Sequence, residues 1–173
     1  MVLPKHDLVC VARLLDEQAP RTCAAVWDSL PLGGDVYHAK YARNELYTFV
    51  PPFAPAPIGQ ENPTITPIPG DLVYFEFSSG MLPASTYGYD EESGEGAAGA
   101  DHVIDLALFY GRNNLLINGD VGWVPGNVFG EVVEGLDDLV AVGNDIWRAG
   151  SVGEELLFRR ASGLGASGQG ASR

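Results

Sequence analysis

The stretch from Gly122 to Val140 constrains the fold more than any other part of the sequence, because its periodicity changes within a few residues. Pro125-Gly126 is typical of a tight turn, since proline presets its own φ and glycine tolerates the positive φ that follows. The β-prone run Val128–Val133 then predicts a strand. After Gly135, apolar residues recur at steps of three and four, which predicts a helix lying on a core.

Length and composition favour one folded, turn-rich domain. The chain has 173 residues, 46% of them hydrophobic, with 22 Gly and 12 Pro, which indicates a β protein with a single core. We expect one domain over residues 1–161 and a flexible Gly/Ser/Ala-rich tail over 162–173. No apolar run is long enough to cross a bilayer, and the first residues lack the basic segment and apolar core of a signal peptide. A cytoplasmic location is therefore expected.

The charge balance restricts the partners. The formal net charge of −13 disfavours nucleic acid and anionic membranes, which require Lys and Arg to neutralise phosphate. The expected partner is instead a small molecule or a peptide, and a homo-oligomer is left open. Cys10 and Cys23 lack metal-ligand spacing and are expected to be free, buried thiols. The acidic stretch from Asp90 to His102 matches neither a calcium loop nor a zinc pair, so no metal and no cofactor are expected.

The order of the expected elements gives a mainly β architecture with two helices. The helices are expected over Pro20–Leu30 and Leu136–Trp147. The Pro-rich segment 51–69 predicts an extended surface loop, and the polar insertion Ser78–Ala100 predicts a mobile lid. The last strand is expected to pair with the first and to close a barrel. Strands are expected over Leu8–Leu15, Val36–Tyr41, Glu45–Val50, Leu72–Phe77, Asp101–Tyr110, Val128–Val133 and Glu154–Arg160.

Several of these stretches resemble the cyclophilin family. Val128–Gly135 looks like the family's strand-and-helix signature, and Trp123-Val124 stands where its binding-site Trp-Leu pair lies. Ala19–Thr22 is similar to the start of a cyclophilin helix, and Pro69–Val73 to the start of a strand. The resemblance implies a closed cyclophilin-like β-barrel of about eight strands with two α-helices.

The chain is more similar to the short bacterial proteins of cyclophilin-like fold and unknown function than to true cyclophilins. Leu30-Pro31, His38, Glu45–Tyr47 and Trp123–Asn127 carry that similarity, which brings no known reaction. It implies an apolar groove that binds a small ligand or a peptide. The residues expected to line this groove are Tyr47, Thr48, Phe53, Phe109, Trp123, Val124 and Asn127.

The resemblance also bears on prolyl isomerase activity. Cyclophilins use an Arg to stabilise a twisted amide, against a barrier of about 18–20 kcal/mol. In this chain Thr48 stands at the position of that Arg, so efficient isomerase activity is not expected. An isomerase that works with a displaced Arg43 is the alternative.

A third alternative is an undescribed small-molecule enzyme whose catalytic residues are drawn from His38, Glu45 and Asp105, with His102 as a further candidate. Asp105 interrupts an apolar run on the same face as Ala107, which predicts partial burial. A buried carboxyl needs a partner or a raised pKa, so Asp105 is the most informative of the candidates. The competing interpretation of Asp105 is a structural hydrogen-bonding role.

Overall fold

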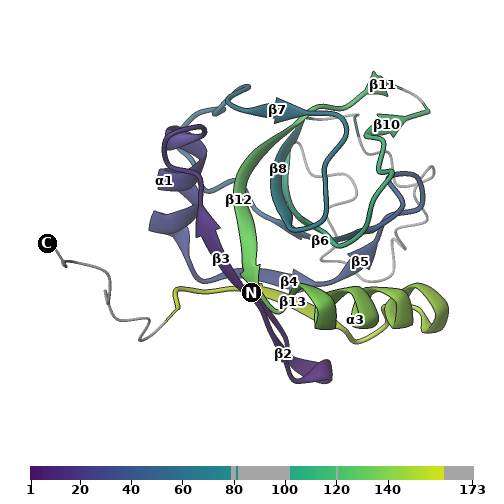
Figure 1. Cartoon of the computed structure of the whole chain (residues 1–173). Helices are drawn as coiled ribbons and strands as arrows, with labels where there is room; N and C mark the ends of the chain where they lie inside the picture. The colour runs from purple at the N-terminus through teal and green to yellow at the C-terminus, as the bar shows by residue number, and fades with distance from the viewer. Residues whose placement is uncertain (79–80, 82–101, 120, 162–173) are drawn as a thin grey trace, which may run out of the picture.

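The computed structural model describes residues 1–78, 81, 102–119 and 121–161, which form a mainly β domain with two α-helices (Figure 1). The expected lid Ser78–Ala100, apart from Ser78 and the lid's Met81, and the tail 162–173 lie outside these residues. The helices are α1 (Pro20–Ser29) and α3 (Leu136–Ala149), and a 3-10 turn, η1, covers Pro4–His6. The strands are β1 (Val2–Leu3), β2 (Leu8–Val9), β3 (Val11–Leu14), β4 (Leu32–Asp35), β5 (Tyr37–His38), β6 (Glu45–Val50), β7 (Pro63–Thr64), β8 (Asp71–Ser78), β9 (His102–Phe109), β10 (Ile117–Asn118), β11 (Gly122–Trp123), β12 (Gly126–Glu134) and β13 (Glu155–Phe158).

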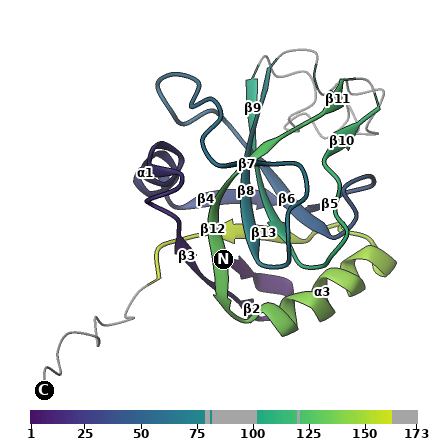
Figure 2. The ribbon, with the colours of Figure 1, turned by 45° about the horizontal axis from the view of Figure 1, so that its top comes forward.

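The strands form two main antiparallel sheets and a small hairpin. The seven-stranded sheet has the order β3-β12-β8-β9-β6-β5, with β7 paired to β12. The four-stranded sheet has the order β2-β1-β13-β4, and β10 pairs only with β11. Strands β4 and β13 run across β8 and β9 at a steep angle, so the two main sheets pack as crossed layers (Figure 2).

The two main sheets are joined through the chain itself. β2 passes into β3 through Cys10, whose N–H donates to Met1 O at 2.9 Å, and β4 passes into β5 through Val36, whose N–H donates to Glu154 O at 3.0 Å. The expected single strand Leu8–Leu15 is therefore broken at Cys10. Because the described strands fall into separate ladders, the expected closed barrel is not confirmed. The last strand, β13, pairs with β1 and β4 rather than with residues 8–15.

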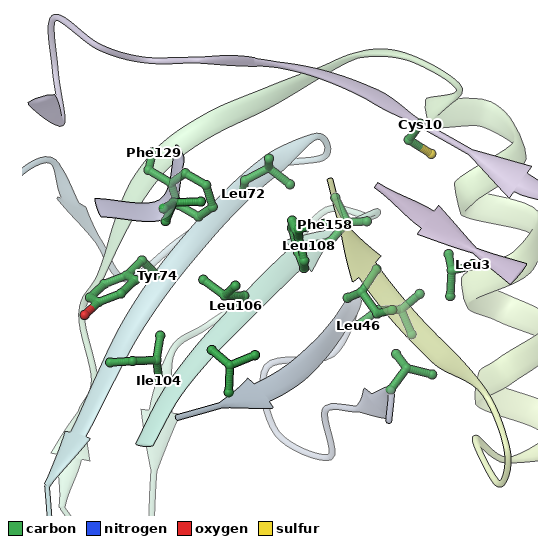
Figure 3. Close-up of a cluster of buried hydrophobic side chains, with 14 of the residues drawn as sticks. Leu3, Cys10, Leu46, Leu72, Tyr74, Ile104, Leu106, Leu108, Phe129 and Phe158 are labelled. Carbon is green, nitrogen blue, oxygen red and sulfur yellow. The ribbon is translucent and has the colours of Figure 1, made fainter. Parts of the chain in front are cut away.

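An inner core fills the space between the crossed sheets (Figure 3). Side chains of β6, β8, β9 and β12 meet those of β1 and β13 there, and both helices contribute: Cys23 and Val26 from α1, Leu139 and Ile146 from α3. Apolar stripes at helical spacing explain why these two segments are helices, since each stripe is buried in the core. Large side chains that are fully buried here include Leu3, Leu46, Leu72, Ile104, Leu106, Leu108, Phe129 and Leu156.

The seven-stranded sheet is also buried on its other side, which we call the outer face. Strand β9 is buried from Val103 to Phe109, because alternate residues face the inner core and the outer face. Loops that precede β6 and follow β9 cover part of the outer face. The resulting outer cluster consists of Ala39, Ala42, Val73, Phe75, Ala107, Phe109, Leu116 and Val128.

Other expectations from the sequence are confirmed. Both helices and the strands β6, β8, β9 and β12 lie where the periodicity places them. Cys10 and Cys23 are free and buried. In the described part of the chain, no helix has the length and apolarity needed to span a membrane.

Candidate functional site

The outer face brings two buried carboxyl groups together on neighbouring strands. Glu45 on β6 is 5% exposed and Asp105 on β9 is 6% exposed. Both alternate with residues of the inner core, such as Leu46 and Leu106, so both carboxyls belong to the outer face. Two of the three candidate catalytic residues therefore lie on one surface of one sheet.

Asp105 is surrounded in register by aromatic residues. Its direct partners across the sheet are Phe49 on β6 and Phe75 on β8. Two residues further along β9, the small Ala107 faces Tyr47 and Val73. The carboxyl of Asp105 thus projects between Phe49 and Phe75, beside the small side chain of Ala107.

Aromatic rings flank Asp105 on both sides. On one side, Tyr37, Tyr47 and Phe49 form an aromatic trio, with ring centroids 5.3–5.6 Å apart. On the other side, Phe75 and Phe77 are stacked with centroids 5.9 Å apart and planes only 8° from parallel. Such separations are those of favourable aromatic pairs, and flat ring faces are good surfaces for another planar group.

One oxygen of Asp105 has no hydrogen-bond partner. Among the described residues, Asp105 Oδ1 is a buried side-chain oxygen without a donor, as are the hydroxyls of Thr48 and Tyr74. Both of those hydroxyls belong to residues that face inward, across from Leu106. Glu154 also has a buried oxygen without a hydrogen bond, but that oxygen lies 3.2 Å from His6 Nε2 in an ion pair. Among the described residues, Asp105 Oδ1 is therefore the one buried carboxyl oxygen on the outer face that lacks a partner. A buried acceptor without a donor costs about 1–3 kcal/mol and calls for an explanation.

The surroundings of the two carboxyls shift their pKa values in the same direction. Burial raises the pKa of Glu45 to about 8. Burial raises the pKa of Asp105 well above its usual range, and the negative charge of Glu45 raises it further. Low-dielectric surroundings and a nearby like charge both favour the neutral acid. Near neutral pH the pair therefore holds at least one proton.

His38 does not join this pair. It lies opposite Leu46 on the inward side of β5, while its neighbour Tyr37 faces outward. Its Nδ1 is 3.0 Å from Ala39 O and must donate to that carbonyl, so in the neutral ring Nε2 accepts the Tyr110 hydroxyl at 2.5 Å. Burial lowers the pKa of His38, which favours this neutral form. Both ring nitrogens are used, so the structure gives His38 a structural role under α3, where its ring lies 4.9 Å from that of Trp147.

The seven expected groove residues are not brought together as one surface. Tyr47, Phe109 and Val124 pack in or against the outer cluster. Thr48 is fully buried and faces the inner core, and Phe53 packs against that core with its ring 6.1 Å from Tyr74. Trp123 is 55% exposed on the β10–β11 hairpin. Thr48 faces inward because a one-residue step along β6 moves a side chain to the opposite face of the sheet, and Phe53 follows the end of that strand.

The side chain of Asn127 also does not line such a groove, because it holds the loop around Gly59 and Glu61 against α1. Its Oδ1 accepts the Glu61 N–H at 2.9 Å, and its Nδ2 donates to Gly59 O at 2.8 Å and to Thr22 Oγ1 at 3.3 Å. Glu61 in turn caps α1, because its carboxylate accepts the backbone N–H groups of Arg21 and Thr22 at 3.1 and 2.8 Å. The preceding residue, Ala19, has no side chain that could do this.

Glu61→Gln is expected to destabilise the fold by about 2 kcal/mol, because an amide can accept from only one of its two ends. Burial acts to raise the pKa of Glu61, but the hydrogen bonds from Thr22 and Arg21 outweigh it and lower that pKa to about 2. The stabilisation is therefore present above the usual carboxyl pKa and is lost as the pH falls from about 4.5 towards 2. Urea unfolding at pH 7 and pH 3 measures both effects. Exposed Glu17 offers the matched control: Glu17→Gln should leave the midpoint unchanged, and an equal loss in the two variants would contradict the capping role.

A shallow hollow on the other side of the molecule has different properties. It lies between β3 and α1 and is lined by Ala12, Leu14, Asp16, Pro20, Cys23, Ala24, Trp27 and Asp28. Its buried thiol, Cys23, already donates to Phe129 O at 3.1 Å. No group of three or more His, Cys, Asp or Glu side chains with the geometry of a metal site occurs among the described residues. The outer face, with its unpartnered carboxyl oxygen, is therefore the candidate site.

Fold and site together define a crossed two-sheet β protein with an acidic pair among aromatic rings. The chain belongs to the DUF3830 family, described as a protein of unknown function, which matches residues 1–158. No curated protein matches it. A solved structure described as McbB in complex with tryptophan has a similar fold, with a TM-score of 0.55 at 18% identity over 94% of this chain. The match covers 45% of that chain, so this protein corresponds to under half of it. Neither comparison supports the cyclophilin resemblance.

Proposed function

We propose that this protein binds a small planar ligand carrying a hydrogen-bond donor on the outer face of its seven-stranded sheet, without efficient prolyl isomerase activity. The observation that carries the proposal is the unpartnered Oδ1 of Asp105, which is nine-tenths buried between the aromatic trio and the stacked Phe75 and Phe77. A ligand N–H or O–H would satisfy this oxygen and recover the cost of its burial.

The surrounding rings favour a planar body for this ligand. Tyr37, Tyr47 and Phe49 are only partly buried, so part of their ring surface is accessible for contact. A flat aromatic ring packed against such faces contributes about 0.5–1.5 kcal/mol beyond its buried area. Aromatic walls with a few polar groups are the usual composition of a small-molecule site.

The same geometry argues against prolyl isomerisation. Thr48 faces the inner core, so even an Arg at this position would point away from the outer face. Arg43 is exposed in the loop before β6, with φ of 78°, and does not lie on the strand. Stabilising a twisted amide requires a donor aimed at it, and the two buried side chains on this face that can titrate are acids.

Tryptophan is a suitable first probe. It combines a planar ring with N–H donors, and McbB, whose fold is similar, was solved with it. Binding of L-tryptophan, tryptamine and a Xaa-Pro peptide would be measured by calorimetry, with a coupled assay for isomerisation of the peptide.

Asp105→Leu is expected to weaken binding of the best probe at least tenfold, because it removes the acceptor while keeping the volume and apolar surroundings. Two variants serve as controls and should change affinity less than about twofold. Glu131→Gln removes a carboxylate that forms an ion pair with Arg13 on the surface, and Trp123→Ala removes the exposed ring of the β10–β11 hairpin.

Three outcomes would overturn the proposal. If the Asp105→Leu variant binds the probe as tightly as the unaltered chain does, the carboxyl of Asp105 is not part of the binding site. If only the Trp123→Ala variant loses binding, the ligand binds at the β10–β11 hairpin instead. If the protein isomerises the peptide well above background, the prolyl isomerase alternative is correct. Urea unfolding of each variant separates a lost contact from a lost fold.

A further inference from the structure

We infer that the ligand of the outer face is an organic cation, and that its binding displaces a proton from the buried carboxyl of Asp105. This inference rests on the proposed function and specifies the ligand's charge. It follows from three observations: the sign of the charges on this face, the rings around them, and the way the free protein keeps the two carboxyls buried.

Apart from one ion-paired arginine, the charged groups that the described strands place on the outer face are acidic. Strand β6 contributes Glu45, β9 contributes Asp105, and β5 and β6 add the phenols of Tyr37 and Tyr47; the cation Arg13, on the edge strand β3, is already paired with Glu131. Strand β8 presents Asp71 at its start and then the apolar Val73, Phe75 and Phe77 on this face, whereas Tyr74 and Glu76 alternate to the other side. Among the described residues of the covering loops, the cations Lys40, Arg43 and Arg112 are exposed or half-exposed rather than buried beside the pair.

The aromatic rings favour the same sign of charge. The face of a Tyr or Phe ring carries negative potential, so a cation within about 6 Å of its centroid is attracted by about 0.5–2 kcal/mol. Tyr37, Tyr47 and Phe49 stand beside Asp105, and Phe75 lies on its other side. A neutral ligand would gain only the hydrogen bond and the stacking, and an anionic ligand would be repelled by the carboxyls.

In the free protein no cation of the described residues is paired with the buried carboxyl of Asp105, so this group avoids a buried negative charge by keeping a proton. Burial raises the pKa of both carboxyls, and the charge of Glu45 raises that of Asp105 further. A bound cation supplies the positive charge that the proton supplied before. The exchange is balanced: one cation enters, one proton leaves to solvent, and the net charge of the site does not change.

Tryptamine and 3-ethylindole provide a matched pair of probes, because they share the planar ring and differ in the ammonium group. Tryptamine is expected to bind at least about tenfold more tightly, and its affinity should rise about tenfold per pH unit between pH 6 and 7, where the ammonium stays charged. Calorimetry at pH 7 in two buffers of different ionisation enthalpy should report close to one proton released per tryptamine.

The Asp105→Asn variant distinguishes proton displacement from simple attraction. It keeps an acceptor oxygen but removes the carboxyl that releases the proton, so proton release and the pH dependence should both fall towards zero. Glu131→Gln, which removes a surface carboxylate, should retain both.

The possible failures are distinguishable. If 3-ethylindole binds as tightly as tryptamine and Asp105→Leu still abolishes binding, the site stands and the cation inference is overturned. No proton release on tryptamine binding would overturn it as well. If Mn²⁺ alone produces the same proton release, the occupant is a metal ion rather than an organic cation. If no planar probe binds, the proposed function fails first.

Discussion

A variant that lacks both buried carboxyls, Glu45→Gln with Asp105→Asn, is expected to keep nearly the same free energy of unfolding from pH 6.5 to pH 9, whereas the unaltered chain loses about 2 kcal/mol or more. The sign follows from the direction of the shifts. Both pKa values are raised in the folded state, so the contribution to stability is complete below the ordinary carboxyl pKa and is lost as the pH rises. Glu45, with a folded pKa of about 8, accounts for about 1.36 kcal/mol per pH unit below that value.

In the chosen pH window the other groups act equally in every variant, including the buried thiols Cys10 and Cys23, whose pKa values are raised by burial. Ordinary carboxyls are fully ionised above pH 6, and His38, whose pKa is lowered by burial, is neutral there. Burial also lowers the pKa of the Met1 amine, which acts with the opposite sign but equally in every variant. Glu131→Gln, which removes one surface charge, should therefore keep the slope of the unaltered chain.

Urea unfolding at several pH values measures this prediction. A flat profile for the unaltered chain would show that the two carboxyls are ionised at little cost, and would remove the protonated pair on which the proton displacement depends. The double variant should also be the more stable protein at pH 9, because amides of the same shape carry no charge into the sheet.

The sequence predicts those parts of the fold that depend on local periodicity. α1 and α3 bury stripes at helical spacing, and β8 and β9 are continuous apolar runs, so their positions follow from neighbouring residues alone. Closure of the sheets depends on how strands pair over long distances. The break at Cys10 and the pairing of β13 with β1 leave no local signal, and the expected barrel was drawn from the resemblance instead.

The site was predicted in part for the same reason. Asp105 stands out as a charge within an apolar run, and Glu45 is the acid at the start of a strand. Their aromatic neighbours Phe49 and Phe75 were missed, although the alternation within Glu45–Val50 and Asp71–Ser78 indicates which residues share a face. What the sequence does not contain is the register, which sets Phe49 and Phe75 on either side of Asp105.

The structure disperses the residues that the resemblance assigns to one groove. Aligning motifs placed Thr48 and Asn127 in a groove, but Thr48 points into the inner core and Asn127 is occupied by Glu61, Gly59 and Thr22. The polar atoms of Asn127 are all used inside the protein, so an aligned position does not imply an available side chain. The hydrogen bonds of the folded chain show the difference: the polar atoms of Asn127 are all bonded, whereas Asp105 Oδ1 has no partner.

Gly33→Ala is expected to destabilise the protein by about 3 kcal/mol or more, which is the largest effect we predict for a single methyl group. Gly33 has φ of +143° and pairs with Leu157, so β4 approaches β13 closely at this point. A Cβ there would lie 2.3 Å from Leu156 O and 2.9 Å from Leu157 Cα. Both are backbone atoms of a paired strand and cannot move aside without breaking the ladder.

The adjacent Gly34 provides the matched control. A Cβ at Gly34 would meet Thr48 Oγ1 at 3.5 Å, an ordinary contact, so Gly34→Ala should be neutral or slightly stabilising. Because β4 leads through Val36 into β5, the displacement caused by Gly33→Ala should also shift Tyr37 out of the aromatic trio and weaken binding of tryptamine. Urea unfolding and calorimetry of the two variants test both consequences. Equal stability of Gly33→Ala and Gly34→Ala would mean that the four-stranded sheet does not depend on the close approach of β4 to β13.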